Sequence, residues 1–96
     1  MGKLPVLSDI EIKRRLGGLP GWSRKGDAIT KTFSFTGYPE SVAFVQRTVR
    51  PAEEMNHHPD IDVRYNRVMV TLSTHDSGGV TENDLLLAEA LDSAAR

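Results

Sequence analysis

The stretch ITKTFSFTGYPESVAFVQRTV, residues 29–49, changes its hydrophobic period halfway along. In its first part the apolar side chains of Ile29, Phe33 and Phe35 lie on one side of an extended chain. Lys31 is the exception on that side, and the alternation predicts a half-buried strand. After a break at residues 37–39, the apolar positions follow one face of a helix, at Val42, Val45, Val49 and Ala52. The switch from a period of two to about 3.6 predicts a strand followed by a helix.

The N-terminal part of the chain predicts a helix and then a hairpin. Ser8 and Glu11 have the spacing of a capping box, which predicts a short helix that ends at the two glycines of residues 17–18. The Gly-Asp pair at residues 26–27 is typical of a hairpin turn, and it precedes the alternating stretch.

The C-terminal part predicts the same elements in the opposite order. Residues 62–65 and 68–72 predict two strands around an Asn-Arg turn. Two glycines at 78–79 form a flexible joint, and Thr81 with Asp84 at the capping-box position begins a last helix. The order helix-strand-strand-helix-strand-strand-helix predicts an α+β fold, with a four-stranded antiparallel sheet and three helices on one face.

One proline interrupts the helical pattern of the central stretch. Inside a helix, Pro51 removes one backbone hydrogen bond and clashes with the carbonyl group of Arg47. We therefore expect a kink or an end of the helix near Val49, with a further turn through Met55.

Composition excludes several classes of protein. The chain has 96 residues, 12 Lys and Arg against 13 Asp and Glu, and no cysteine. Disulfides, Cys-ligated zinc, iron–sulfur clusters and thiol nucleophiles are excluded, and the balanced charge disfavours direct nucleic-acid binding. The longest aliphatic run, residues 85–88, is too short for a membrane span, and no apolar signal core begins the chain. We expect one cytoplasmic domain over residues 1–96.

The three histidines are clustered in the sequence. His57 and His58 follow the central helix and are fixed by Pro59, whereas His75 follows the last predicted strand. In an antiparallel meander these two places come together at one end of the sheet. Glu53 lies one helical turn before His57, where its carboxylate can orient an imidazole ring.

Proton transfer suits this cluster better than metal binding does. Adjacent residues of an extended segment point in opposite directions, and neither the His-x-His nor the His-x-x-x-His spacing occurs. A serine nucleophile is also disfavoured, because neither Ser73 nor Ser77 lies on a nucleophile elbow. Imidazoles titrate near about 6.5, so one histidine can act as a base and another as an acid. We expect no metal and no cofactor.

The residues around the histidines form a specific pattern. It consists of EEMNHHP at 53–59, YNRV at 65–68, STHD at 73–76, two glycines at 78–79 and Thr-Glu-x-Asp at 81–84. This pattern resembles the pterin-4a-carbinolamine dehydratase family, and LPGW at 19–22 extends the resemblance over nearly the whole chain.

The resemblance implies the same fold and a dehydratase reaction. Its substrate is the carbinolamine, a 4a-hydroxytetrahydropterin, formed when an aromatic amino acid hydroxylase oxidises tetrahydropterin. Its products are quinonoid dihydropterin and water. The implied catalytic residues are His57, His58 and His75, and the implied pterin-binding residues are Glu53, Ser73, Thr74, Asp84 and Trp22. The resemblance also implies a homodimer or homotetramer and a functional link to a hydroxylase.

Two residues depart from the family pattern. Ile61 stands where many members have an aromatic residue, and Pro51 is unusual in the helix before Glu53. The first change can alter the pocket wall and the second can shift Glu53, but neither removes a proton-transfer group. The alternative function is a non-catalytic dimerisation cofactor or assembly factor built on the same fold.

Overall fold

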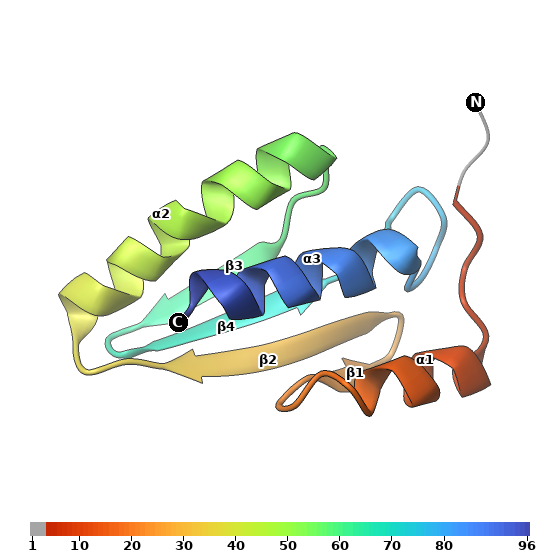
Figure 1. The fold of residues 1–96 in the computed structure, drawn as a ribbon, viewed down its shortest axis with the longest axis horizontal. Helices are drawn as coiled ribbons and strands as arrows, with labels where there is room; N and C mark the ends of the chain where they lie inside the picture. The colour runs from red at the N-terminus through yellow and green to blue at the C-terminus, as the bar shows by residue number, and fades with distance from the viewer. Residues whose placement is uncertain (1–3) are drawn as a thin grey trace.

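The computed structural model describes residues 4–96 and contains three helices and one four-stranded sheet. The elements follow the predicted order (Figure 1). They are α1 (Asp9–Leu16), β1 (Ser23–Lys25), β2 (Ala28–Ser34), α2 (Tyr38–Met55), β3 (Asp60–Arg64), β4 (Arg67–Leu72) and α3 (Glu82–Ala94). The predicted α+β fold class is therefore confirmed.

The sheet is antiparallel, but its strands are not arranged as a simple meander. The strand order is β1-β2-β4-β3, so the two hairpins join through their second strands. This pairing sets Ile29 opposite Leu72 and Phe33 opposite Val68, and all four side chains are buried. The most apolar strands thus occupy the centre of the sheet, where burial contributes most to stability.

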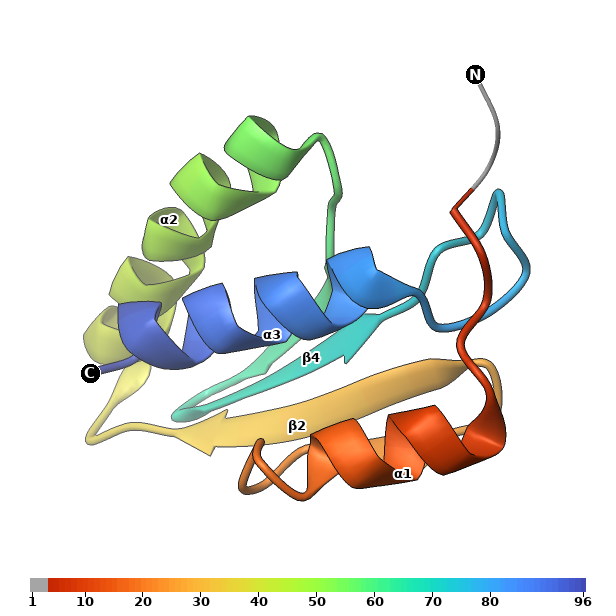
Figure 2. The ribbon, with the colours of Figure 1, turned by 45° about the vertical axis from the view of Figure 1, so that its right-hand side comes forward.

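All three helices contribute to one side of the sheet (Figure 2). Figure 2 shows α3 above β2 and β4, α2 crossing behind it, and α1 alongside β2. A single apolar core lies between these layers, and α1 inserts Ile12 into it. The opposite face of the sheet carries polar side chains such as Thr30, Thr32 and Thr71.

Lys31 lies on the apolar side of β2 because it has partners there. Its Nζ atom donates to Oδ1 of Asp92 at 2.9 Å and to the carbonyl oxygen of Pro20 at 3.0 Å. The same ammonium group lies 4.8 Å from the ring centroid of Phe33. Lys31, the exception to the alternating pattern, is thus paired with Asp92 of α3, far along the chain.

Two local predictions differ from the structure. Helix α2 does not end near Val49 but continues through Pro51 as one element, and it ends at Met55, where the predicted further turn ends. The packing of its buried residues, Ser41, Phe44, Thr48 and Ala52, outweighs the loss of one hydrogen bond. Val42 and Val49 of the predicted apolar face are instead 40% and 56% exposed. The second hairpin turns one residue earlier than predicted, at Tyr65 and Asn66, with Tyr65 in the left-handed region at φ 52°. Among residues 4–96, no helix is long and apolar enough to cross a membrane.

Candidate active site

A pocket of about 260 Å³ lies where α2 ends and β4 leaves the sheet. Its lining comes from two chain segments, Asn56–His58 and Ser73–Asp76. The structure therefore brings His57, His58 and His75 around one space, although the strand order is not that of a meander. A larger depression of about 400 Å³ lies between α1 and β1 and contains no histidine.

The end of α2 sets the directions of the two adjacent histidines. Asn56 caps the helix in the left-handed conformation at φ 49°, which asparagine tolerates better than most residues. The backbone N–H of His57 then donates to the carbonyl group of Ala52 at 3.0 Å. From this point the chain is extended toward β3, so His57 faces α3 whereas His58 turns back toward Glu53.

His57 is held by a buried carboxylate. Its Nε2 atom lies 2.6 Å from Oδ1 of Asp84, whose side chain is fully buried, and the His57 side chain is 11% exposed. The second oxygen, Oδ2, accepts from the hydroxyl group of Thr74 and the backbone N–H of Thr81, both at 2.9 Å. Both Asp84 oxygens therefore have partners within the protein.

These contacts determine which hydrogen bonds each group makes. Because a carboxylate accepts, Nε2 of His57 is assigned as the N–H donor, which leaves Nδ1 without a proton in the neutral ring. Thr74 uses its one hydroxyl proton toward Asp84, so the hydroxyl group of Thr81, 2.7 Å away, donates to Thr74. Asp84 contacts His57 and is not among the residues that line the pocket, and its role as a pterin ligand stays a prediction.

His58 has a more exposed partner. Its Nε2 atom lies 2.6 Å from Oε2 of Glu53, and the two side chains are 58% and 67% exposed. Pro51 has not displaced Glu53 out of reach of this ring, because α2 remains helical to Met55. Glu53 thus lies beside the pocket and contacts its second histidine.

Ser73 and His75 enter the pocket from the segment after β4. The Ser73 hydroxyl group donates to the carbonyl oxygen of Asp27 at 2.7 Å, so its oxygen remains available as an acceptor. His75 is exposed. Asn56 and Asp76 also line the pocket and were not singled out from the sequence. Both belong to the histidine motifs quoted above, which was the available signal.

Two residues of the predicted pocket wall lie elsewhere. Trp22 is 5% exposed, and its indole N–H donates to Oδ1 of Asp92 at 3.0 Å. It also packs edge-on against Phe33, with ring centroids 6.1 Å apart. The tryptophan is a core residue near the C-terminal end of α3, away from the histidines. Ile61 pairs with Val70, packs against the core and is not among the residues that line this pocket.

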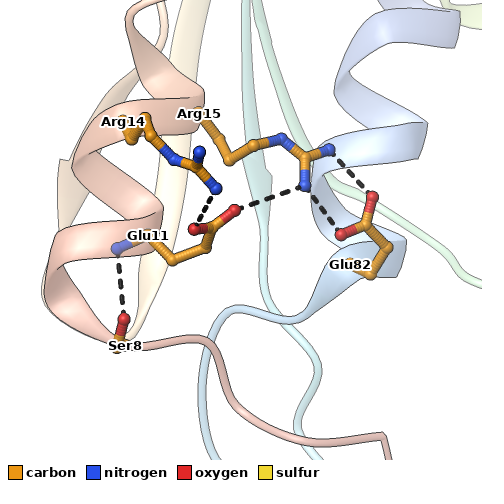
Figure 3. A network of polar contacts seen from close by, with 5 residues as sticks. All are labelled: Ser8, Glu11, Arg14, Arg15 and Glu82. Carbon is orange, nitrogen blue, oxygen red and sulfur yellow. Dashed lines mark hydrogen bonds and ion pairs between the residues drawn. The ribbon is translucent and has the colours of Figure 1, made fainter.

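An ion-pair network ties the start of α3 to α1 (Figure 3). The two terminal nitrogens of the Arg15 guanidinium group, Nη1 and Nη2, donate to Oε1 and Oε2 of Glu82, both at 2.8 Å, and Glu11 lies on the other side of Arg15. The hydrogen bond from Arg15 lowers the pKa of Glu82, and the same contact raises the pKa of Arg15. Since Glu82 begins α3, this network links α1 to the first turn of the helix that carries Asp84.

The site lacks the arrangement of a metal centre. Among residues 4–96, no group of three or more His, Asp or Glu side chains is placed to hold a metal ion. His57 and His58 each face a carboxylate of their own.

Comparison with known proteins agrees with the fold and the motif. A profile of the family described as pterin 4 alpha carbinolamine dehydratase matches residues 5–94. Proteins named "Putative pterin-4-alpha-carbinolamine dehydratase" are 49% identical in Roseiflexus sp. (strain RS-1) and 51% identical in Sulfolobus acidocaldarius. Each alignment covers 90% of this chain, with 92% and 94% of the respective relative.

Two solved structures are also similar. A transcriptional coactivator/pterin dehydratase from Brucella melitensis superposes with a TM-score of 0.91 at 35% identity, over 95% of this chain and 99% of that one. A pterin dehydratase-like protein identified as a RuBisCO assembly factor in the alpha-carboxysome gives a TM-score of 0.62 at 27% identity, over 77% of this chain and 86% of that one. By sequence profile, relatives and fold, the chain belongs to the pterin-4a-carbinolamine dehydratase family.

Proposed function

We propose that the histidine pocket dehydrates a 4a-hydroxytetrahydropterin to quinonoid dihydropterin and water. The observation that carries this proposal is the convergence of three imidazoles on one pocket, one of them oriented by a buried carboxylate. Family membership supplies the substrate class. The proposed physiological role is pterin recycling in the cytoplasm, alongside an aromatic amino acid hydroxylase.

The reaction needs one proton donor and one proton acceptor. The hydroxyl group on the bridgehead carbon leaves as water after it gains a proton, and the neighbouring ring N–H loses one. His57 suits the acceptor role, because Asp84 holds its Nε2–H and leaves Nδ1 free. As His57 becomes positively charged, the adjacent carboxylate stabilises that charge.

The proton for the leaving hydroxyl group comes from His58 or His75. The carboxylate of Glu53 lies 2.6 Å from Nε2 of His58, where it can orient that ring at the edge of the pocket. His75 lines the same pocket from the opposite chain segment. The chemistry requires no cofactor, since one water molecule leaves and no electrons are exchanged with a second reactant.

The experiment is a dehydration assay on freshly generated pterin carbinolamine, followed by absorbance. Wild-type protein is compared with His57→Ala, His58→Ala and His75→Ala, each checked for cooperative unfolding. Loss of an acid or base is expected to lower kcat by about 10²- to 10⁴-fold. A folded wild type that does not accelerate the reaction contradicts the proposal. The pH dependence of the residual rate of each variant identifies the proton donor. In the variant that lacks the donor, the rate should no longer fall as pH rises.

A binding role is the second candidate. The outer face of α2 exposes Tyr38, Val42 and Val49, with 55%, 40% and 56% of each residue accessible. One structural relative is described as an assembly factor. Catalysis remains the stronger proposal, because binding a partner through the outer face of α2 requires neither the three histidines nor their carboxylate partners.

A further inference from the structure

The first described residues of the chain run along the loop that follows β4 (Figures 1 and 2). The hydroxyl group of Ser77 donates to the carbonyl oxygen of Leu4 at 2.6 Å. Three residues later, the backbone N–H of Leu7 donates to the carbonyl oxygen of Val80 at 2.9 Å. The segment Leu4–Leu7, which we call the N-terminal strap, is therefore attached to this loop at both ends.

The loop is a tight turn that presents His75. An isolated bridge pairs Thr74 with Gly79, and the backbone N–H of Ser77 donates to the carbonyl group of Thr74 at 3.0 Å. Gly78 has φ +82°, a conformation that favours glycine. His75 lies at the beginning of the turn, so the backbone of the turn determines where its ring enters the pocket.

His75 differs from the other two histidines in what orients its ring. His57 and His58 each face a carboxylate at 2.6 Å. Within residues 4–96, the ring of His75 makes no side-chain hydrogen bond to the protein. Its placement therefore depends on the turn and on whatever packs behind the turn.

The strap packs tightly behind the turn at Gly79. A Cβ atom added at Gly79 would lie 3.0 Å from Cγ1 of Val6, closer than ordinary van der Waals contact. Val6 is 47% exposed, but the backbone on either side of it is held against the turn by the hydrogen bonds at Leu4 and Leu7. A side chain at Gly79 would therefore require Val6 or the turn to move by a few tenths of an ångström.

We infer that the N-terminal strap is a positioning element for His75, which it holds in place by bracing the turn Thr74–Gly79 from behind. The effect on turnover rests on the proposed dehydratase function, whereas the effect on the place of His75 does not. A displacement of about 1 Å at a reacting group is enough to cost an enzyme one to two orders of magnitude in rate.

The test is a compensation experiment at the Val6–Gly79 contact. Gly79→Ala is expected to lower kcat about tenfold with KM changed less than about twofold. The double variant Val6→Ala/Gly79→Ala restores most of the wild-type kcat, because alanine at position 6 removes the methyl group that the new Cβ meets. Val6→Ala alone leaves kcat unchanged, since the hydrogen bonds from the Ser77 hydroxyl to Leu4 and from the Leu7 N–H to Val80 remain.

Gly18→Ala is the matched control for the glycine substitution. A Cβ atom added there lies at an ordinary 3.7 Å from the carbonyl oxygen of Arg15. This variant should keep the wild-type kcat.

NMR signals of the His75 ring give a second measurement that needs no turnover. They should shift in Gly79→Ala, return toward the wild-type position in the double variant, and stay unchanged in Gly18→Ala. Unshifted signals in a folded Gly79→Ala variant would overturn the inference, and so would a double variant that is no closer to wild type than Gly79→Ala. An inactive wild type with this NMR pattern would contradict the proposed function and leave the strap supported.

Discussion

The Nε2 atom of His57 lies 2.6 Å from Oδ1 of Asp84, a carboxylate with no solvent exposure. The same carboxylate accepts the backbone N–H of Thr81 at the start of α3. One side chain therefore both caps a helix and orients a histidine. The direction of the His57 ring is thus coupled to the docking of α3 on the sheet.

Asp84→Asn tests this coupling. The asparagine amide can donate to Nε2, which favours the opposite tautomer of His57 and places a proton on the nitrogen proposed as the base. In a serine protease triad the equivalent change lowers kcat about 10⁴-fold, and we expect a loss of at least about 10²-fold here. The ¹⁵N shifts of the His57 ring report the tautomer directly.

Asp92→Asn is the matched control, because Asp92 lies on the same helix and accepts from Trp22 and Lys31. It should lower stability and leave kcat unchanged. Equal kcat losses in folded Asp84→Asn and Asp92→Asn variants would show that the effect arises from the helix and not from His57.

The Glu82–Arg15 pair predicts a pH-dependent contribution to stability. Arg15 lowers the folded-state pKa of Glu82 below the ordinary value of 4.5. The contribution is therefore fully present above pH 4.5 and is lost as pH falls through the folded pKa. Because the side chains are 29% and 45% exposed, solvent screening limits it to about 1 kcal/mol or less.

Denaturant unfolding of wild type and Glu82→Gln should thus differ at pH 7 and converge near pH 3. Glu54→Gln serves as control, since its partner Arg50 is on the same helix and both side chains are largely exposed. The Glu54 variant should match wild type at both pH values. A constant Glu82→Gln difference across this range would show that the lost stability is not electrostatic.

Trp22→Phe separates a core role from a pocket role. The substitution keeps an aromatic ring but removes the indole donor to Asp92, leaving a mostly buried acceptor with one partner fewer. We expect about 1–2 kcal/mol of lost stability and unchanged kcat and KM. A several-fold rise in KM for the pterin would instead place the tryptophan at a binding site, as the family resemblance implied.

The edges of the sheet predict self-association. Strands β1 and β3 are the outer strands, and their outward backbone groups can pair with another chain. We propose a homodimer or homotetramer. Sedimentation at micromolar protein concentration should show one of these species, and a stable monomer would rule them out.

Hydrophobic periodicity predicted most of the fold. The change of period between Ile29 and Val49 correctly indicates β2 followed by α2, and the capping residue Ser8 correctly indicates the start of α1. Periodicity could not predict that β4 lies beside β2, because strand order depends on which apolar faces bury most area together. Periodicity could not predict the ion pair of Lys31 either, because its partner Asp92 is 61 residues away and no local pattern reveals it.

The site was predictable as a group of residues more than as a geometry. The motif spacing identified the three histidines that line the pocket, and the capping-box pattern identified Asp84. The sequence did not show that Asp84 is fully buried against His57, because that contact requires α3 to pack next to the end of α2. The position of Trp22 in the core likewise depends on the docking of α3.

The most direct test of the central claim is the rate of pterin carbinolamine dehydration with wild-type protein, measured above the spontaneous background and beside folded His57→Ala. We predict clear acceleration by wild type and a loss of at least about 10²-fold in the variant. A wild type no faster than the background, or a folded His57→Ala variant as fast as wild type, would contradict acid–base catalysis by this pocket.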